Sequence, residues 1–322
     1  MSDRNPTALR VTFLGTSSGV PTRARNVSGI ALQLPQRSEM WLLDCGEATQ
    51  HQILRNPQLN SNQTRRIFIT HMHGDHIYGL PGFLSTLGMS NVPNEVDVYG
   101  PPGLKEYLEG VLRWSESRIN YPYRVHTVET GLLLDEGKYQ VYCAPLDHRV
   151  QAFGYRIVES DRPGTFNLDK AKADGIPPGP VYGRLKAGET VELEDGRSVD
   201  GRNYVGADVP GRKMAYCTDT IFCRNAIDLA RASDLLIHEA TFAESDLHLA
   251  KRAKHSTAAM AAQVAKEAKV DTLMLTHFSP RYGPEGPITM EDLQAEAEAV
   301  FTNTLVARDR LTYEIPRRTA PS

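Results

Sequence analysis

Short apolar runs rich in Val, Ile and Leu recur along the chain, and several of them end in a polar residue. They predict buried strands over residues 11–14, 41–43, 67–69, 214–216, 235–237 and 273–275. Apolar residues at helical spacing between these runs predict helices over residues 82–87, 103–112, 256–268 and 290–301. Because strands alternate with helices, the sequence predicts an α/β fold.

Residues 155–212 depart from this pattern. They are rich in Gly, Pro and charged residues, and they contain the run Gly-Ile-Pro-Pro-Gly-Pro at 175–180. We expect a flexible insertion, or projecting arm, within a single domain that spans residues 1–322. Over residues 155–214 basic and acidic residues are equally numerous, so the segment as a whole is neutral. Composition alone therefore favours a surface loop without a binding role over a binding arm.

The composition is that of a globular protein, with 40% apolar and 23% charged residues and a formal net charge of -3 over 322 residues. No apolar run approaches the roughly 18 residues of a membrane span. The first residues also lack the segments of a secretory signal, so we expect a cytoplasmic protein with no membrane partner. The widely spaced Cys45, Cys143, Cys217 and Cys223 form no Cys-x-x-Cys pair, which argues against a disulfide framework or a cysteine zinc site.

The most specific string is Thr-His-Met-His-Gly-Asp-His at residues 70–76, which follows a predicted strand. Imidazole and carboxylate together suit zinc in a catalytic site. We expect His71 and His73 to project to one side and Asp75 and His76 to turn towards a second position. The loop would then supply half of the ligands for each of two metal ions.

Further donors are needed to complete two metal sites, and His148, Asp219 and His277 are the candidates. Each stands at the end of a short apolar run. A single His or Asp there is more often a hydrogen-bonded structural residue, but the repeated placement favours ligands. Asp219 could bridge the ions, because a carboxylate has two oxygens. Zinc, two ions per subunit, is the default expectation, with Mn²⁺ or another divalent ion as the alternative.

At this point the sequence resembles the metallo-β-lactamase superfamily, whose pattern is His-x-His-x-Asp-His after a strand. Residues 42–47, Leu-Leu-Asp-Cys-Gly-Glu, resemble its first motif, in which an Asp braces the metal loop, and His148, Asp219 and His277 match its later ligand motifs. The resemblance implies a four-layer αββα sandwich of two sheets with helices on both outer faces.

Three further motifs resemble the short form of the ribonuclease Z family, which removes 3′ trailers from precursor tRNA. They are Gly-Thr-Ser-Ser-Gly-Val-Pro at 15–21 with Arg-Ala-Arg-Asn at 23–26, His-Glu-Ala-Thr at 238–241 and Lys-His-Ser-Thr at 254–257. The resemblance implies a zinc-dependent endoribonuclease that cuts near the discriminator nucleotide and leaves a 3′-hydroxyl on the tRNA and a 5′-phosphate on the trailer.

The resemblance also implies catalytic roles. Asp75 would act as the base that accepts a proton from the attacking water. His255, oriented by Glu239, would donate a proton to the leaving 3′ oxygen. The structural alternative for residues 254–257 is a helix start, with Ser256 or Thr257 as the cap.

For RNA binding, the resemblance points to the loop after the first strand and to the arm. Arg23, Arg25 and Asn26 would meet the RNA 3′ end; the family often has Pro-x-Lys-x-Arg-Asn here, and Arg23 replaces the Lys. The arm over residues 155–212 would be an exosite that grips the tRNA body. It would reach from one subunit of a homodimer to the active site of the other. Gly179, Pro180 and Arg184 are its candidate contacts.

Two other functions compete with this interpretation. A small-molecule hydrolase of the same fold, such as a phosphodiesterase, would use the same metal ligands but would have no use for the arm. A binding protein with a dead metal centre is the third possibility. It is the least favoured because every proposed ligand is present, and metal analysis would test it.

Overall fold

Two seven-stranded sheets form the centre of the computed structural model, which describes residues 9–89, 95–283 and 286–318. The first sheet has the order β16 (Thr312–Ile315), β1 (Leu9–Gly15), β2 (Gly29–Leu34), β3 (Glu39–Cys45), β4 (Thr64–Phe68), β5 (Val96–Gly100) and β6 (Tyr123–Thr127). The second has the order β15 (Thr304–Val306), β14 (Thr272–Thr276), β13 (Leu235–Glu239), β12 (Lys213–Cys217), β9 (Ala152–Glu159), β8 (Tyr139–Leu146) and β7 (Gly131–Asp135).

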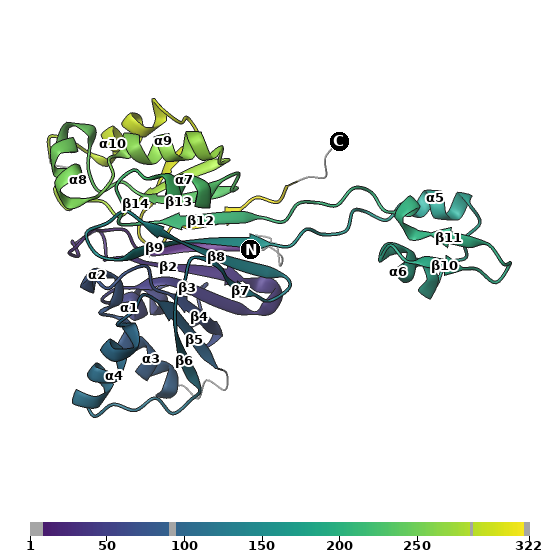
Figure 1. The fold of residues 1–322 in the computed structure, drawn as a ribbon, viewed down its shortest axis with the longest axis horizontal. Coiled ribbons are helices and arrows are strands. Elements are labelled where there is room, and N and C mark those ends of the chain that lie inside the picture. The colour runs from purple at the N-terminus through teal and green to yellow at the C-terminus, as the bar shows by residue number, and fades with distance from the viewer. Residues whose placement is uncertain (1–8, 90–94, 284–285, 319–322) are drawn as a thin grey trace.

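Helices cover the outer face of each sheet (Figure 1). The first sheet is covered by α1 (Thr49–Leu54), α2 (Gly74–Ile77), α3 (Leu80–Met89) and α4 (Leu104–Trp114), and the second by α7 (Arg224–Ala230), α8 (Leu247–Ala253), α9 (Ala258–Ala268) and α10 (Met290–Glu298). The predicted four-layer αββα sandwich is confirmed. The predicted strands fall on β1, β3, β4, β12, β13 and β14, and the predicted helices on α3, α4, α9 and α10. Among the described residues, no helix has both the length and the apolar character needed to cross a membrane.

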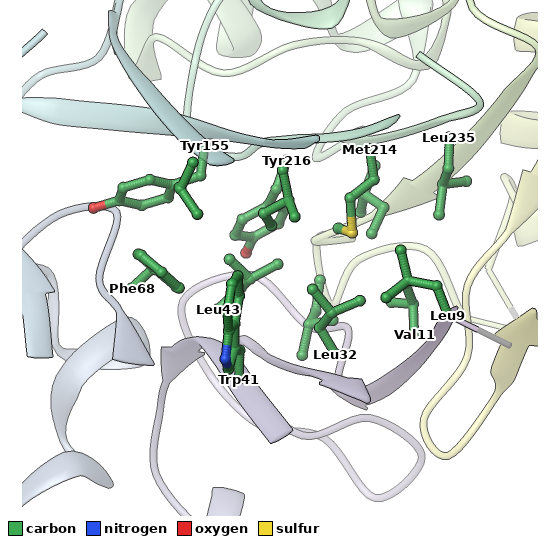
Figure 2. Packing of buried hydrophobic residues seen from close by; sticks show 14 of the residues in the cluster. Leu9, Val11, Leu32, Trp41, Leu43, Phe68, Tyr155, Met214, Tyr216 and Leu235 are labelled. Carbon is green, nitrogen blue, oxygen red and sulfur yellow. The ribbon is translucent and has the colours of Figure 1, made fainter. Parts of the chain in front are cut away.

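The main core lies between the two sheets. Figure 2 shows side chains of β1 to β4 meeting those of β9, β12 and β13, with Trp41 and Phe68 opposite Tyr155 and Tyr216. Alternate strand residues point to this interface, as the period of a strand requires. Two tyrosines also join the layers through hydrogen bonds, because the Tyr155 hydroxyl donates to the Ile69 carbonyl (2.6 Å) and the Tyr216 hydroxyl to Asp44 (3.0 Å). The two sheets are therefore held in a fixed relation at the end where the metal motif lies.

An arm leaves the sandwich between β9 and β12 and projects far from it (Figure 1). Its tip contains α5 (Leu168–Ala173), α6 (Pro180–Lys186) and the hairpin of β10 (Thr190–Glu192) and β11 (Ser198–Asp200). A small core at the tip includes Ala171, Ile176, Leu185, Val191 and Tyr204. The expected start of the arm at Tyr155 is too early, because residues 155–159 complete β9 and pair with β8 and β12.

Candidate active site

The sequence-predicted metal ligands come together at the ends of several strands. His71 and His73 follow β4, Asp75 and His76 lie on α2, and His148, Asp219 and His277 follow β8, β12 and β14 in turn. Asp219 and His277 have φ angles of 50° and 59°, in the left-handed region that non-glycine residues seldom adopt. Such strain is concentrated at functional sites, and here it turns both side chains towards the same locus.

One group of donors consists of His71, His73, His148 and Asp219. The Nε2 of His71 lies 3.0 Å from Nδ1 of His73, and Nε2 of His148 lies 3.4 Å from that same Nδ1. Asp219 Oδ2 lies 3.4 Å from His71 Nε2 and 3.8 Å from His148 Nε2. The donor atoms therefore converge on one point, as the spacing of His71 and His73 predicted.

A second group consists of Asp75, His76 and His277, and Asp219 presents its other oxygen to it. Asp219 Oδ1 lies 3.2 Å from Nε2 of His76 and 3.2 Å from Nε2 of His277. Asp75 Oδ2 lies 3.4 Å and 3.5 Å from the same two nitrogens. Asp219 thus stands between the two groups with one oxygen towards each, which is the arrangement expected of a bridging carboxylate.

The chemistry of these donors fits divalent metal ions. Within the described part of the chain, the buried Nε2 atoms of His76 and His277 have no hydrogen-bond partner, and an unsatisfied buried nitrogen is costly unless something binds it. Burial lowers the pKa of His76, but the charges of Asp219, Asp44 and Asp75 outweigh it and hold that pKa well above its ordinary value. These carboxylates thus stabilise a positive charge at the site, and a bound cation would supply it.

Hydrogen bonds behind the donors fix the orientation of the imidazoles. His76 Nδ1 donates to Asp44 Oδ2 (2.8 Å), and Asp44 also accepts from the backbone N–H of Thr70 (2.8 Å). His148 Nδ1 donates to the Lys254 carbonyl (3.0 Å). Partners of this kind select the tautomer in which Nε2 is free to bind a metal. Asp44 therefore braces the metal loop, as its motif implied.

His255 and Glu239 form a close pair beside the metal donors. His255 Nδ1 lies 2.8 Å from Glu239 Oε1, and its Nε2 lies 3.9 Å from Asp219 Oδ2. Burial lowers the pKa of His255, but the Glu239 charge outweighs this and raises the pKa to about 9. His255 can therefore carry a proton at neutral pH. The helix-cap alternative is also correct in part, because the Thr257 side chain caps α9.

The loop after β1 reaches the same site through its backbone. The Gly19 N–H donates to Asp75 Oδ2 (2.8 Å). Arg23 is exposed and lines a cleft next to Phe278. The side chains of Arg25 and Asn26 instead bond within the protein: Arg25 Nη1 donates to Thr16 Oγ1 (2.7 Å) and Asn26 Nδ2 donates to the Glu47 carbonyl (2.8 Å).

Comparison with known proteins identifies the family. A ribonuclease Z of Picosynechococcus sp. is 57% identical over 97% of this chain and 98% of its own length, and one of Acaryochloris marina is 55% identical over 97% and 99%. This chain belongs to the ribonuclease Z family. The β-lactamase superfamily domain model matches residues 197–278, and the model of the anti-Pycsar protein Apyc1 matches residues 9–150.

Solved structures agree with this family and fold. The short form of human tRNase Z has 28% sequence identity and a TM-score of 0.68, over 95% of this chain and 99% of that one. The metallo-β-lactamase fold protein YhfI of Bacillus subtilis has 19% identity and a TM-score of 0.66, over 95% of this chain and 99% of its own. The second likeness concerns the fold alone.

The predicted arm contacts of this family member lie at the tip of the arm and not at the metal donors. Gly179 and Pro180 are exposed at the start of α6, and Arg184 lies on the same helix with its Nε 2.9 Å from Glu189 Oε2. The arm joins the sandwich at Glu159 and Lys213, whereas Asp219 lies beyond the other end of β12. The arm and the metal donors of one chain are therefore at opposite ends of the second sheet (Figure 1).

Sequence reasoning missed three residues that support the site. Thr241 accepts from His277 Nδ1 (3.0 Å) and donates to Glu239 Oε2 (2.5 Å), so it links His277 to the His255–Glu239 pair. Thr241 stands in the His-Glu-Ala-Thr motif, and this motif was the sequence feature that could have identified it. Tyr216 ends a predicted strand, and its contact with Asp44 had no signal of its own. Asp309, which contacts the loop after β1, lies in no motif.

Proposed function

We propose that this chain is a tRNA 3′-processing endoribonuclease. It hydrolyses a phosphodiester of precursor tRNA near the discriminator nucleotide and leaves a 3′-hydroxyl on the tRNA and a 5′-phosphate on the trailer. The observation that carries the proposal is the His255–Glu239 pair beside the two donor groups, in a chain 57% identical to a ribonuclease Z. Precursor tRNA is made inside the cell, so the proposed location is the cytoplasm.

The donor set supports two zinc ions per subunit, with Mn²⁺ as an alternative occupant. His71, His73, His148 and Asp219 would hold one ion, and Asp75, His76, His277 and Asp219 the other. Two such ions polarise a phosphodiester and lower the pKa of water towards about 7. The proton transfers of the reaction would depend on side chains of this chain.

Asp75 is the proposed base. Burial raises its pKa, but the neighbouring His76 and His277 outweigh burial and hold the pKa well below its ordinary value. Its carboxylate is therefore ionised at neutral pH and can accept the proton of the water that attacks phosphorus. As the bond from phosphorus to the 3′ oxygen breaks, His255 would give its proton to that oxygen, while Glu239 keeps the imidazole in the correct orientation.

The direction of the arm supports a homodimer. The tip of the arm points away from the metal donors of its own chain (Figure 1), so a tRNA held there would lie far from that site. An arm that serves the active site of a partner subunit removes this difficulty. A second contact remote from the cut raises the effective concentration of the substrate and selects for tRNA shape.

The test is cleavage of a 5′-labelled precursor tRNA that carries a 3′ trailer. The purified protein is compared with Asp75→Ala and with a chelated sample, and the product end is mapped. We expect one cut near the discriminator that is lost in both controls. An intact precursor, with metal bound and the protein folded, would contradict the proposal and would direct the search to small phosphodiesters.

A further inference from the structure

A carboxylate near the carboxyl terminus holds the loop that follows β1. Asp309 Oδ1 accepts from the Thr16 hydroxyl (2.8 Å), and Asp309 Oδ2 accepts from the Asn26 backbone N–H (2.6 Å). Gln52 Nε2 also approaches Oδ2 (3.3 Å). Asp309 therefore clamps both ends of the loop, from a segment almost 300 positions away in the sequence.

Arg25 completes this clamp instead of pointing to solvent. Its Nη1 donates to Thr16 Oγ1 (2.7 Å) and to the Ala307 carbonyl (2.8 Å), and its guanidinium lies 4.8 Å from the ring centre of Phe278. Such a stacked, hydrogen-bonded guanidinium is held in one orientation. Arg25 thus ties the loop to the carboxyl-terminal segment and to the residue that follows His277.

Backbone hydrogen bonds connect the clamped loop to the active site. The Ser18 N–H donates to the Phe278 carbonyl (3.0 Å), and the Phe278 N–H donates to the Thr16 carbonyl (2.9 Å). One residue further on, the Gly19 N–H donates to Asp75 Oδ2 (2.8 Å). The position of the Gly19 amide is therefore set by groups that the Asp309 carboxylate holds.

We propose that Asp309 is a positioning residue for the proposed RNA cleavage, and that through Thr16, Arg25 and Asn26 it keeps the Gly19 N–H on the Asp75 carboxylate. This inference rests on the proposed function, because Asp75 is the base there. It also gives Arg25 and Asn26 an internal role in place of the RNA contact expected from their motif, and leaves Arg23 as the exposed cation of the loop.

The test separates kcat from KM for precursor tRNA. Asp309 acts on Asp75 through the loop and not by direct contact. Asp309→Ala should therefore lower kcat by about tenfold, the size of effect expected when a supporting partner is lost. KM should stay within about twofold of its wild-type value. Asp309→Asn keeps one acceptor oxygen and should recover kcat to within about threefold of wild type. Glu314→Ala is the matched control, because this exposed carboxylate of the same carboxyl-terminal segment pairs with Arg10 (3.5 Å) and should change neither constant.

A second readout does not need RNA cleavage. In metal-loaded protein, Asp309→Ala should speed hydrogen exchange of the Gly19 amide, while metal content stays at the wild-type level. Thr16→Val, which replaces the hydroxyl with a methyl group, should act in the same direction if Asp309→Ala is too unstable to purify. If wild type fails to cut precursor tRNA, the proposed function fails, and the exchange measurement still tests the clamp.

Three results would overturn the inference. The first is unchanged kcat in Asp309→Ala together with unchanged exchange at Gly19. The second is a rise in KM at constant kcat, which would indicate that the loop contacts RNA directly. The third is a kcat loss in Asp309→Asn as large as that in Asp309→Ala.

Discussion

The metal end of this molecule and the tip of its arm differ in how their polar side chains are held. At the metal end, polar side chains such as His71, His76 and Glu239 are completely buried and held by further hydrogen bonds. At the arm tip, charged side chains are exposed and pair with near neighbours, as Arg184 does with Glu189 and Arg202 with Asp200. Chemistry needs donor atoms fixed in place, whereas the proposed grip of the arm on tRNA can rely on shape and exposed surface charge.

The two ends also differ in how much they depend on the rest of the fold. The metal donors come from strands of both sheets, so they exist only when the whole sandwich is formed. The arm tip has its own small core around Leu185 and Val191. We therefore expect substitutions at the metal end to affect every substrate, and changes in the arm to affect only large ones.

The largest expected effect is that of Asp219→Ala. This change removes the oxygens that face both donor groups, so both metals should be lost. Activity should fall by about 10³-fold or more on precursor tRNA and on bis(p-nitrophenyl) phosphate alike, with bound metal measured by elemental analysis. Asp147→Ala is the control, since this exposed carboxylate pairs with Lys254 outside the donor groups (2.7 Å) and should leave activity unchanged. Full metal content in Asp219→Ala would refute the bridging role.

Removal of the arm should distinguish the contribution of the arm to activity from that of the metal end. The roots of the arm lie together, because the Gly211 N–H donates to Asp161 Oδ1 (2.9 Å), so a short Gly-Ser linker can replace residues 162–210. We expect cleavage of precursor tRNA at low substrate concentration to fall about 10²-fold, while hydrolysis of the small reporter stays within about twofold. Equal loss on both substrates would mean that the arm serves the fold and not recognition.

The contrast between the two ends also explains what the sequence could predict. His71, His73, Asp75 and His76 follow β4 of the first sheet, and Asp219 and His277 follow the parallel strands β12 and β14 of the second. Each of these strands contains a short apolar run in the sequence, so the local pattern was enough to propose these residues as donors. Asp309 and Thr16 are almost 300 positions apart in the sequence. A contact between such distant residues produces no periodic pattern from which it could be predicted. The sequence predicts the start of the arm too early, because residues 155–159 are followed directly by the Gly- and Pro-rich segment, although they still alternate as a strand.

The root of the arm provides a prediction about stability. Arg212 Nε and Nη2 donate to the two oxygens of Glu159 (2.7 and 3.0 Å), and both side chains are only 2% exposed. Arg212→Met leaves a buried carboxylate without this partner, and it should lower the free energy of unfolding by about 3 kcal/mol. Urea unfolding measures this loss, and Glu159→Gln together with Arg212→Met should recover most of it. If the double variant is no more stable than the single one, the pair does not account for the loss.

The same pair gives a pH dependence. Burial raises the pKa of Glu159, but hydrogen bonds and charge from Arg212 outweigh it, so the folded pKa lies below the ordinary value of 4.5. The stability from the pair is therefore complete above that ordinary pKa and is lost as the pH falls through the folded pKa. The difference between wild type and Arg212→Met should shrink below about pH 4.5. A difference that is constant down to pH 3 would show that packing, and not charge, is what Arg212 supplies.

The smallest expected effect belongs to a single charge at the arm tip. If Arg184 exchanges its Glu189 partner for a phosphate of the tRNA, then Arg184→Ala should raise KM for precursor tRNA only a few-fold, because one exposed contact contributes about 1 kcal/mol or less. It should also reduce the slope of log KM against log salt concentration by about one, the change expected for one lost phosphate contact. Arg202→Ala is the matched control, since this arginine of the arm is 79% exposed and pairs with Asp200 in the same manner. If the slope falls equally in both variants, the arginines of the tip attract the RNA through their general positive charge, and Arg184 makes no specific phosphate contact. If the slope falls only in Arg184→Ala, the phosphate contact lies on α6.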